Sequence, residues 1–141
     1  MPTWLKVVVA GIAVLALLFI VAGLMVVKAV EAGKRAAEEA SVEGEEYGAR
    51  GSLEGCLQEG VRRFATCDSV KIRCSFVIDT FLWSCLESAP YDSRFCAEIP
   101  EAGNDAAVTQ WATKVCARHG SANDDWCSFN LSVVPAFCAS R

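Results

Sequence analysis

The sequence predicts an all-α protein with a single N-terminal transmembrane helix, a helical stalk, and a small disulfide-rich domain of two helical hairpins. Two observations carry this fold class: residues 7–27 are apolar and contain no charged residue, and all 8 cysteines lie in the C-terminal part at spacings that suit helices. We expect a transmembrane anchor over residues 1–28, a helical stalk and flexible joint over 29–52, and a disulfide-bonded domain over 53–141.

The apolar run is long enough to cross a membrane. As an α-helix, residues 7–27 would extend for roughly 31 Å at 1.5 Å per residue, which matches the roughly 30 Å hydrocarbon core of a bilayer. Trp4, Lys6 and Lys28 flank the run, and aromatic and cationic side chains favour the headgroup level. We therefore expect a single-pass anchor that contacts the lipid bilayer through residues 7–27.

Cleavage of this segment as a signal peptide is the alternative. Residues 30–32 (Val-Glu-Ala) offer a small-residue cleavage site, and cleavage near Ala32 would release a secreted disulfide-rich effector or carrier. The apolar region of a signal peptide is normally shorter, about 7 to 15 residues, and Lys28 and Glu31 place charge where the cleavage region is usually neutral. Both features favour an uncleaved helix.

Two signals for the orientation of the helix disagree. Lys6 precedes the apolar run, whereas Lys28, Lys34 and Arg35 follow it, and the excess of positive charge normally lies in the cytoplasm. Eight cysteines in a small domain instead indicate an oxidising compartment. We give the cysteines more weight, because the short N-terminal tail is a weak topological signal, and expect the C-terminal domain to be periplasmic or extracellular.

The stalk is predicted from strong helix-forming residues directly after the apolar run. Glu31 precedes Lys34 and Arg35 by three and four positions, where opposite charges on a helix attract each other. Three glycines, at positions 44, 48 and 51, then lower the helical propensity. We expect a flexible joint near residues 44–52.

The cysteine spacing predicts the helices of the C-terminal domain. Most neighbouring cysteines are separated by ten residues, and eleven positions advance a helix by about three turns, so cysteines with this spacing share one face. The segments 56–67 and 74–85 would form the first antiparallel hairpin. Residues 105–118 and 127–138 would form the second.

Local signals mark the ends of the second hairpin. Asp105 is expected to cap the N-terminus of its first helix, and Gly120 to end that helix. Residues 123–125 (Asn-Asp-Asp) would start the last helix, and Pro135 should kink or shorten it.

Hairpin geometry predicts a nested disulfide pattern, because the outer positions of two antiparallel helices face each other, as do the inner positions. Many other pairings of eight cysteines are possible. The expected bridges are Cys56–Cys85, Cys67–Cys74, Cys96–Cys138 and Cys116–Cys127.

The first four cysteines resemble a known family. The pattern C-x10-C-x6-C-x10-C over residues 56–85 is similar to the twin helix-cysteine hairpins of the coiled-coil-helix-coiled-coil-helix family, in which nine residues separate the paired cysteines. The resemblance implies a disulfide-bonded helical hairpin for these 30 residues, and no function is carried over from it.

The charge distribution argues against nucleic-acid binding. All 17 acidic residues follow the apolar run, and the chain has a net charge of −4, which repels a phosphate backbone. Arg62 and Arg63 are the only adjacent pair of Lys or Arg residues in the predicted domain over 53–141, and we interpret them as a solvated helix face.

The sequence offers little chemistry for catalysis or for metal binding. It has no C-x2-C to C-x4-C pair for zinc, no C-x-x-C redox motif, and one histidine, His119, which we place at a helix end where a cation suits the helix dipole. Asp124 and Asp125 are interpreted as a helix cap and a first-turn anion. We therefore predict no catalytic residue, no cofactor and no metal.

These observations predict a membrane-anchored, extracytoplasmic binding or structural module, such as an accessory subunit of an envelope complex, with a protein partner. Aromatic residues next to cysteines are expected to pack around the bridges, and some could belong to a partner surface; they are Trp83, Phe95, Trp126 and Phe137. An enzyme would need a polar cleft near His119. No oligomeric state is indicated.

Overall fold

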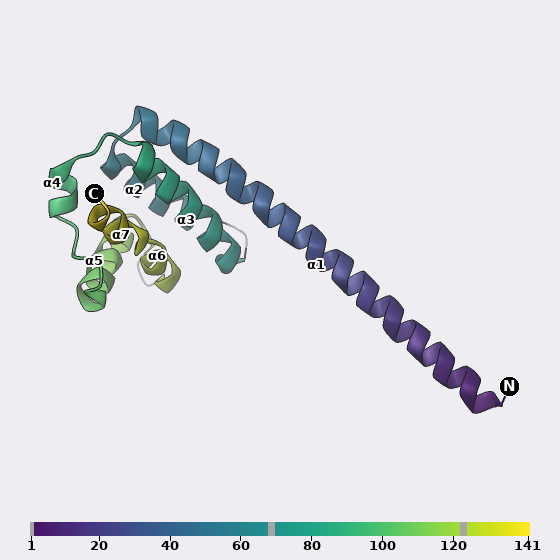
Figure 1. Ribbon diagram of the computed structural model, residues 1–141. Coiled ribbons are helices and arrows are strands. Elements are labelled where there is room, and N and C mark those ends of the chain that lie inside the picture. The colour runs from purple at the N-terminus through teal and green to yellow at the C-terminus, as the bar shows by residue number, and fades with distance from the viewer. Residues whose placement is uncertain (1, 68–69, 122–123) are drawn as a thin grey trace. The chain divides into compact units, whose positions relative to one another are not determined.

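The computed structural model describes residues 2–67, 70–121 and 124–141, and no strand occurs among them (Figure 1). The all-α class is therefore confirmed. The chain divides into two compact units, Met1–Arg35 and Ala36–Arg141, which we call unit 1 and unit 2. The helices are α1 (Thr3–Arg50), α2 (Leu53–Ala65), α3 (Lys71–Ser88), α4 (Ser93–Ala97), α5 (Asp105–Arg118), α6 (Asp125–Asn130) and α7 (Val133–Ala139).

Unit 1 holds the apolar part of α1. This helix is long and apolar enough to cross a membrane, by length and composition, and none of its most apolar window is buried by other parts of the protein. Side chains such as Leu17 and Phe19 are exposed. A helix whose whole circumference is apolar needs an apolar surrounding, and a bilayer supplies one.

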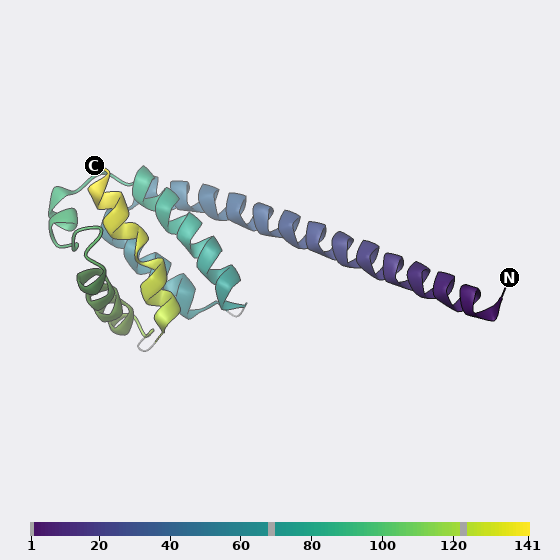
Figure 2. The same cartoon turned by 60° about the horizontal axis from the view of Figure 1, so that its bottom comes forward.

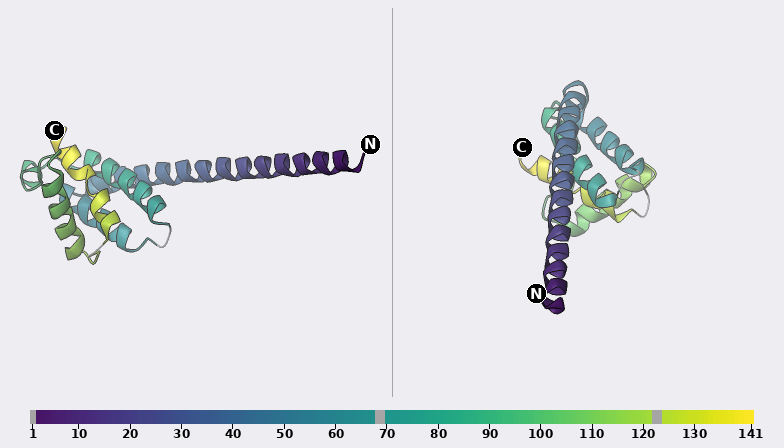
Figure 3. Two further views of the ribbon diagram at one scale, coloured as in Figure 1. Left: turned by 90° about the horizontal axis from the view of Figure 1, so that it is seen from below. Right: turned by 90° about the vertical axis from the view of Figure 1, so that its right-hand side faces the viewer.

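Unit 2 contains one continuous hydrophobic core. In it α2 packs on α3, α5 packs on α6, and α3 packs on both α6 and α7. Two views show the α6–α7 segment between α5 and α3 (Figures 2 and 3). The largest fully buried side chains come from several helices and are Phe64, Phe81, Phe137, Leu53, Leu82, Leu86, Leu131, Val61 and Val134.

The expected flexible joint over residues 44–52 is wrong, because α1 continues as a helix to Arg50. Gly44 and Gly48 are buried at points where α3 approaches closely. A Cβ atom at Gly44 would meet the backbone oxygen of Phe81, and one at Gly48 would meet that of Cys85. The glycines therefore permit close helix packing rather than flexibility.

The C-terminal part of α1 is thus a helix of unit 2, and not a stalk outside the domain. Ser41 and Ser84 share a hydrogen bond of 2.9 Å between their hydroxyl groups. Tyr47 packs edge-on against Phe81, with ring centroids 6.0 Å apart. The folded unit begins at Ala36, well before the boundary at residue 53 that we had expected.

The basic pair in α2 is only partly a solvated helix face. Arg62 is exposed, but the side chain of Arg63 is 29% exposed. Arg63 donates to Glu59 at 2.9 Å and to Glu43 of α1 at 2.6 Å, and its guanidinium lies 3.8 Å from the ring centroid of Phe81. This cluster therefore joins α2 to α1 and α3.

Glu59 accepts hydrogen bonds from both Arg62 and Arg63. The hydrogen bond from Arg62 lowers the pKa of Glu59 below its usual value, and a second bond from Arg63 acts in the same direction against the effect of burial. A carboxylate whose pKa is lower in the folded state contributes stability above its unfolded pKa of about 4.3. That stability is lost as the pH falls through the folded pKa.

The substitution Glu59→Gln is expected to lower the unfolding free energy at pH 7 by about 1.5 to 3 kcal/mol, because hydrogen bonds to a charged group are lost. It should also reduce the loss of stability between pH 5 and pH 3. Urea unfolding of the full chain in detergent, followed by circular dichroism, measures both effects. Glu54→Gln is the control on the same helix, since Glu54 accepts only from Gln58. An unchanged acid dependence in Glu59→Gln would contradict the assignment.

The first helix of the second hairpin has a different N-cap than expected but ends as expected. Asn104, and not Asp105, caps α5, since its side chain accepts from the backbone N–H of Ala107 at 3.2 Å. Asp105 lies in the first turn, where a negative charge suits the helix dipole. Gly120 follows α5 with φ of +87°, which agrees with the predicted helix stop. The helix α4 was not predicted.

The last helix is divided into α6 and α7 rather than continuous. Asp124 caps α6, because its side chain accepts from Trp126 N–H and Cys127 N–H; Asn123, which we had included in this start, lies outside the described residues. Pro135 lies in the first turn of α7. A proline there lacks the N–H that would bond to Leu131 of a continuous helix and would clash with that residue, so the expected shortening is confirmed.

Candidate functional site

The four disulfides have the nested pairing that the hairpin geometry predicts. All 8 cysteines are bonded. The bridges and their Cα–Cα distances are Cys56–Cys85 at 5.7 Å, Cys67–Cys74 at 6.2 Å, Cys96–Cys138 at 5.4 Å and Cys116–Cys127 at 6.2 Å.

The bridges belong to the core of unit 2. Cys56 and Cys85 are fully buried, and their bridge joins the start of α2 to the end of α3. Cys96–Cys138 joins the short α4 to the C-terminal helix α7. Cys96 and Cys138 are only partly buried, whereas the fully buried Cys56–Cys85 bridge is inaccessible to thiols in solution, which supports a structural role for it.

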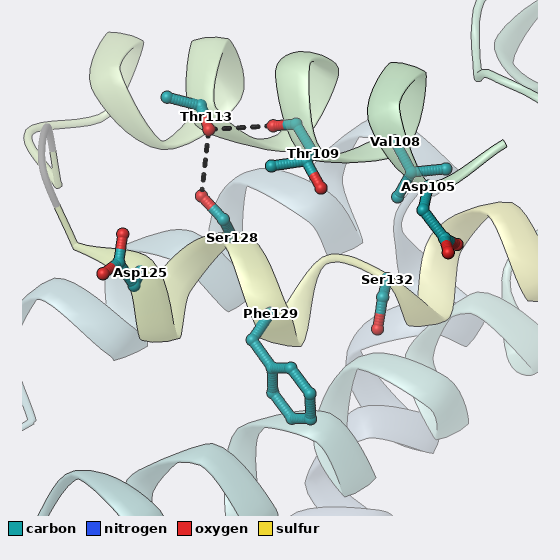
Figure 4. A pocket seen from close by; sticks show the side chains of 8 residues that line it. All are labelled: Asp105, Val108, Thr109, Thr113, Asp125, Ser128, Phe129 and Ser132. Carbon is teal, nitrogen blue, oxygen red and sulfur yellow. Dashed lines mark hydrogen bonds between the residues drawn. The ribbon is translucent and has the colours of Figure 1, made fainter.

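A groove between α5 and the α6–α7 segment is the main concave surface that we consider for binding (Figure 4). We call it the α5–α6 groove, and its volume is about 420 Å³. Its lining residues are Asp105, Val108, Thr109, Thr113, Asp125, Ser128, Phe129 and Ser132. A groove of this size is within the range of sites for small molecules or short peptide segments.

Hydroxyl groups line the middle of the α5–α6 groove. Thr113 donates to the backbone oxygen of Thr109 at 2.8 Å and lies 3.4 Å from the hydroxyl of Ser128. Figure 4 shows Ser128 pointing toward Thr113, and the ring of Phe129 projecting away from α5. Hydroxyl groups can donate and accept, so this surface suits polar backbone or side-chain groups of a ligand.

The ends of the groove carry negative charge and its rim is aromatic. Asp105 and Asp125 lie at opposite ends of the groove (Figure 4). Phe129 is 67% exposed, and its ring packs edge-on against Trp126 with centroids 6.3 Å apart. The combination favours a ligand with cationic and apolar groups. Sequence reasoning missed the groove, although Thr109 and Thr113 have the four-residue spacing of one helix face.

The aromatic residues beside the cysteines have different surroundings. Trp83 packs edge-on against the buried Phe137 at 6.4 Å, and Phe95 is partly buried against the core. These residues pack within the domain, as expected. Trp126 is 40% exposed and so is available to a partner.

His119 lines a small cavity with two carboxylates. Its backbone N–H bonds to the end of α5, which matches its predicted position at a helix end. The cavity has a volume of about 150 Å³, and Glu54, Glu98 and Arg118 also line it. Among the described residues, no hydrogen bond or ion pair joins the His119 side chain to either carboxylate.

No group of three His, Cys, Asp or Glu side chains is arranged to hold an ion within residues 2–67, 70–121 and 124–141. The adjacent Asp124 and Asp125 have separate roles, since Asp124 caps α6 and bonds to Lys71 at 3.0 Å.

The fold and these surfaces define a class of protein: an all-α, four-disulfide domain that follows one helix able to span a membrane. Comparisons with protein-family models, curated proteins and solved structures found no match to this chain.

Proposed function

We propose that this protein is a membrane-anchored, extracytoplasmic binding module without catalytic activity, such as an accessory subunit of an envelope complex. The single observation that carries the proposal is the presence of four disulfides in a domain joined to a span-length apolar helix. Structural disulfides persist in oxidising compartments. The domain would therefore lie outside the cytoplasm, against the charge signal of Lys28, Lys34 and Arg35.

The α5–α6 groove is the proposed surface for the protein partner. The hydroxyl groups that line the groove would form hydrogen bonds with a polar segment of the partner. Asp105 and Asp125 would attract cationic side chains of the partner at the two ends of the groove. Phe129 would contact an apolar residue next to the groove. Exposed aromatic residues contribute much of the binding energy at protein interfaces. The partner segment that fits this surface is a basic peptide with at least one apolar side chain.

Photo-crosslinking in cells tests this surface. A benzophenone amino acid replaces Phe129 in the full chain, and the matched control carries it at Val42, an exposed apolar position of α1. We expect one discrete protein adduct from position 129, none from position 42, and loss of the adduct when Asp105→Lys and Asp125→Lys are added. Equal adducts at both positions, or no adduct at 129, would contradict the proposed surface.

A released form is the second candidate. Unit 2 begins at Ala36, so cleavage after Ala32 would leave the folded unit complete, and a signal sequence can have the same length and composition as this apolar helix. N-terminal sequencing of the protein isolated from cells distinguishes the two forms. A mature N-terminus at Gly33 would favour a secreted effector or carrier over the anchored module.

A further inference from the structure

A second exposed apolar surface lies at one end of unit 2, where α3 and α6 begin. It consists of Val70, Ile72, Phe76 and Trp126, which we call the turn-end patch, and these side chains are 40% to 74% exposed. Ile72 and Phe76 lie four positions apart on α3 and share a face. Large apolar side chains gathered in water in this way indicate an interaction surface.

The two halves of the turn-end patch are held together by polar contacts. Lys71, between Val70 and Ile72 in the chain, forms an ion pair with Asp124 at 3.0 Å. One turn further on, Asn130 of α6 donates to the hydroxyl of the buried Ser75 at 2.9 Å. The beginnings of α3 and α6 are therefore adjacent, and Trp126 belongs to the same end as Val70 and Ile72.

The chain enters unit 2 at this same end. Ala36 is the first residue of unit 2, and it lines a cavity of about 390 Å³ together with Cys67 and Cys74. Those two cysteines flank the connection from α2 to α3, which leads directly to Val70. The entry point of the chain and the turn-end patch are thus close neighbours within unit 2.

The length of the connecting chain limits how far this end can move from a membrane. Residues 27–36 would cover roughly 14 Å as a helix and at most about 32 Å when fully extended. The headgroup layer adds roughly 5 to 8 Å outside the hydrocarbon core. The connecting chain therefore keeps the entry point of unit 2 within reach of the bilayer surface.

The chemistry of the patch suits that surface. Tryptophan and aliphatic side chains partition into the interface between headgroups and acyl chains. Arg73 lies between Ile72 and Cys74 and is exposed, so its guanidinium can reach lipid phosphates when the patch meets the bilayer. Asp125 is the exposed acidic residue beside Trp126, while Lys71 neutralises Asp124.

We propose that the turn-end patch docks on the headgroup layer of the bilayer that α1 crosses. The proposal rests on the membrane anchoring proposed above and is independent of the protein partner. Docking would cover the exposed apolar side chains of the patch. It would also hold the adjoining α5–α6 groove at a fixed height above the membrane, where a partner subunit of the same membrane could reach it.

Quenching of tryptophan fluorescence by brominated lipids tests the docking. The full chain carrying Trp4→Phe is reconstituted in phosphatidylcholine and phosphatidylglycerol vesicles whose acyl chains are brominated near the headgroup. We expect quenching that disappears when Trp126→Phe is added. Ile72→Glu should also abolish it, because a charge is placed in the patch, whereas Val42→Glu, at an exposed position elsewhere in unit 2, should leave it unchanged.

Three other outcomes would contradict the proposal, and the fluorescence data distinguish them. Quenching of Trp4 in the unsubstituted chain, with none of Trp126, would overturn the docking and leave the membrane anchor intact. Absence of quenching at both positions would overturn the anchor as well. Equal quenching in the Ile72→Glu and Val42→Glu variants would show that the patch does not mediate the contact. The crosslinking experiment at Phe129 is unaffected by any of these results.

Discussion

Removing the Cys56–Cys85 bridge by a double substitution to alanine is expected to cause a large loss of stability in the domain, and a larger one than removal of the Cys67–Cys74 bridge. The bridge closes a separation of 29 residues, and the loop-entropy relation gives about 3.6 kcal/mol for a loop of that length. Both cysteines are fully buried, so lost packing adds to this cost. Because small domains have a total stability of about 5 to 15 kcal/mol, the variant should be close to unfolding.

The matched control is the double alanine variant of Cys67 and Cys74, whose bridge closes a separation of 7 residues. The same relation gives about 2.4 kcal/mol for this shorter loop, and Cys67 is only partly buried. Urea unfolding of the full chain in detergent, without reductant, compares the two variants. If the unfolding free energy fell by the same amount in both variants, the larger contribution that we assign to the Cys56–Cys85 bridge would be incorrect.

The substitution Gly48→Ala is expected to lower the stability of the domain by steric conflict with α3. Its new Cβ atom would meet the carbonyl carbon and oxygen of Cys85, which are backbone atoms and cannot rotate away as the end of a side chain can. Residues 36–50 must then move away from α3, at a cost of about 1 to 3 kcal/mol. The better helical propensity of alanine offsets at most about 1 kcal/mol.

Gly33→Ala is the control for this change, because it makes the same substitution in the same helix at a position with no atom within 4 Å. It should not lower the stability of the domain. The midpoints of thermal unfolding of the two full-length variants compare their stabilities. A Gly48→Ala variant as stable as the Gly33→Ala variant would show that residues 36–50 do not pack against α3. That result would favour the flexible joint that the sequence predicts over residues 44–52.

The disulfide pairing could be predicted because it depends on helical periodicity. Ten intervening residues place Cys74 and Cys85 on one face of α3, whereas Cys56 lies in α2 and Cys67 lies just past the C-terminal end of that helix. Two antiparallel faces of equal length can be joined in the nested order. The apolar run was predictable for a similar reason, since its length and composition are properties of a single segment.

The role of residues 36–50 could not be predicted, because glycine has the same low helical propensity in a flexible joint and in a tightly packed helix. Only the approach of Phe81 and Cys85, which are distant in sequence, distinguishes the two cases. The division of the last helix was partly predictable from Pro135, whereas the position of the break depends on the chain fold around Leu131.

The α5–α6 groove and the turn-end patch were not predictable from the sequence. Thr109, Thr113 and Ser128 are ordinary polar residues of helix surfaces, and they form one lining only because α5 packs against α6. Trp126 and Trp83 each lie within two residues of a cysteine in the sequence. Trp126 is nevertheless exposed, whereas Trp83 packs against Phe137. Neither difference is encoded in local spacing.

The central claim is that a four-disulfide domain is held outside the cytoplasm by one membrane helix. Intact mass spectrometry of the alkylated, unreduced full-length protein purified from membranes tests this claim most directly. We predict a mass that is lower than that of the reduced chain by the eight hydrogen atoms lost in forming four disulfides, with no alkylated cysteine. Alkylation of all eight thiols in freshly lysed cells would contradict the claim and place the domain in the cytoplasm.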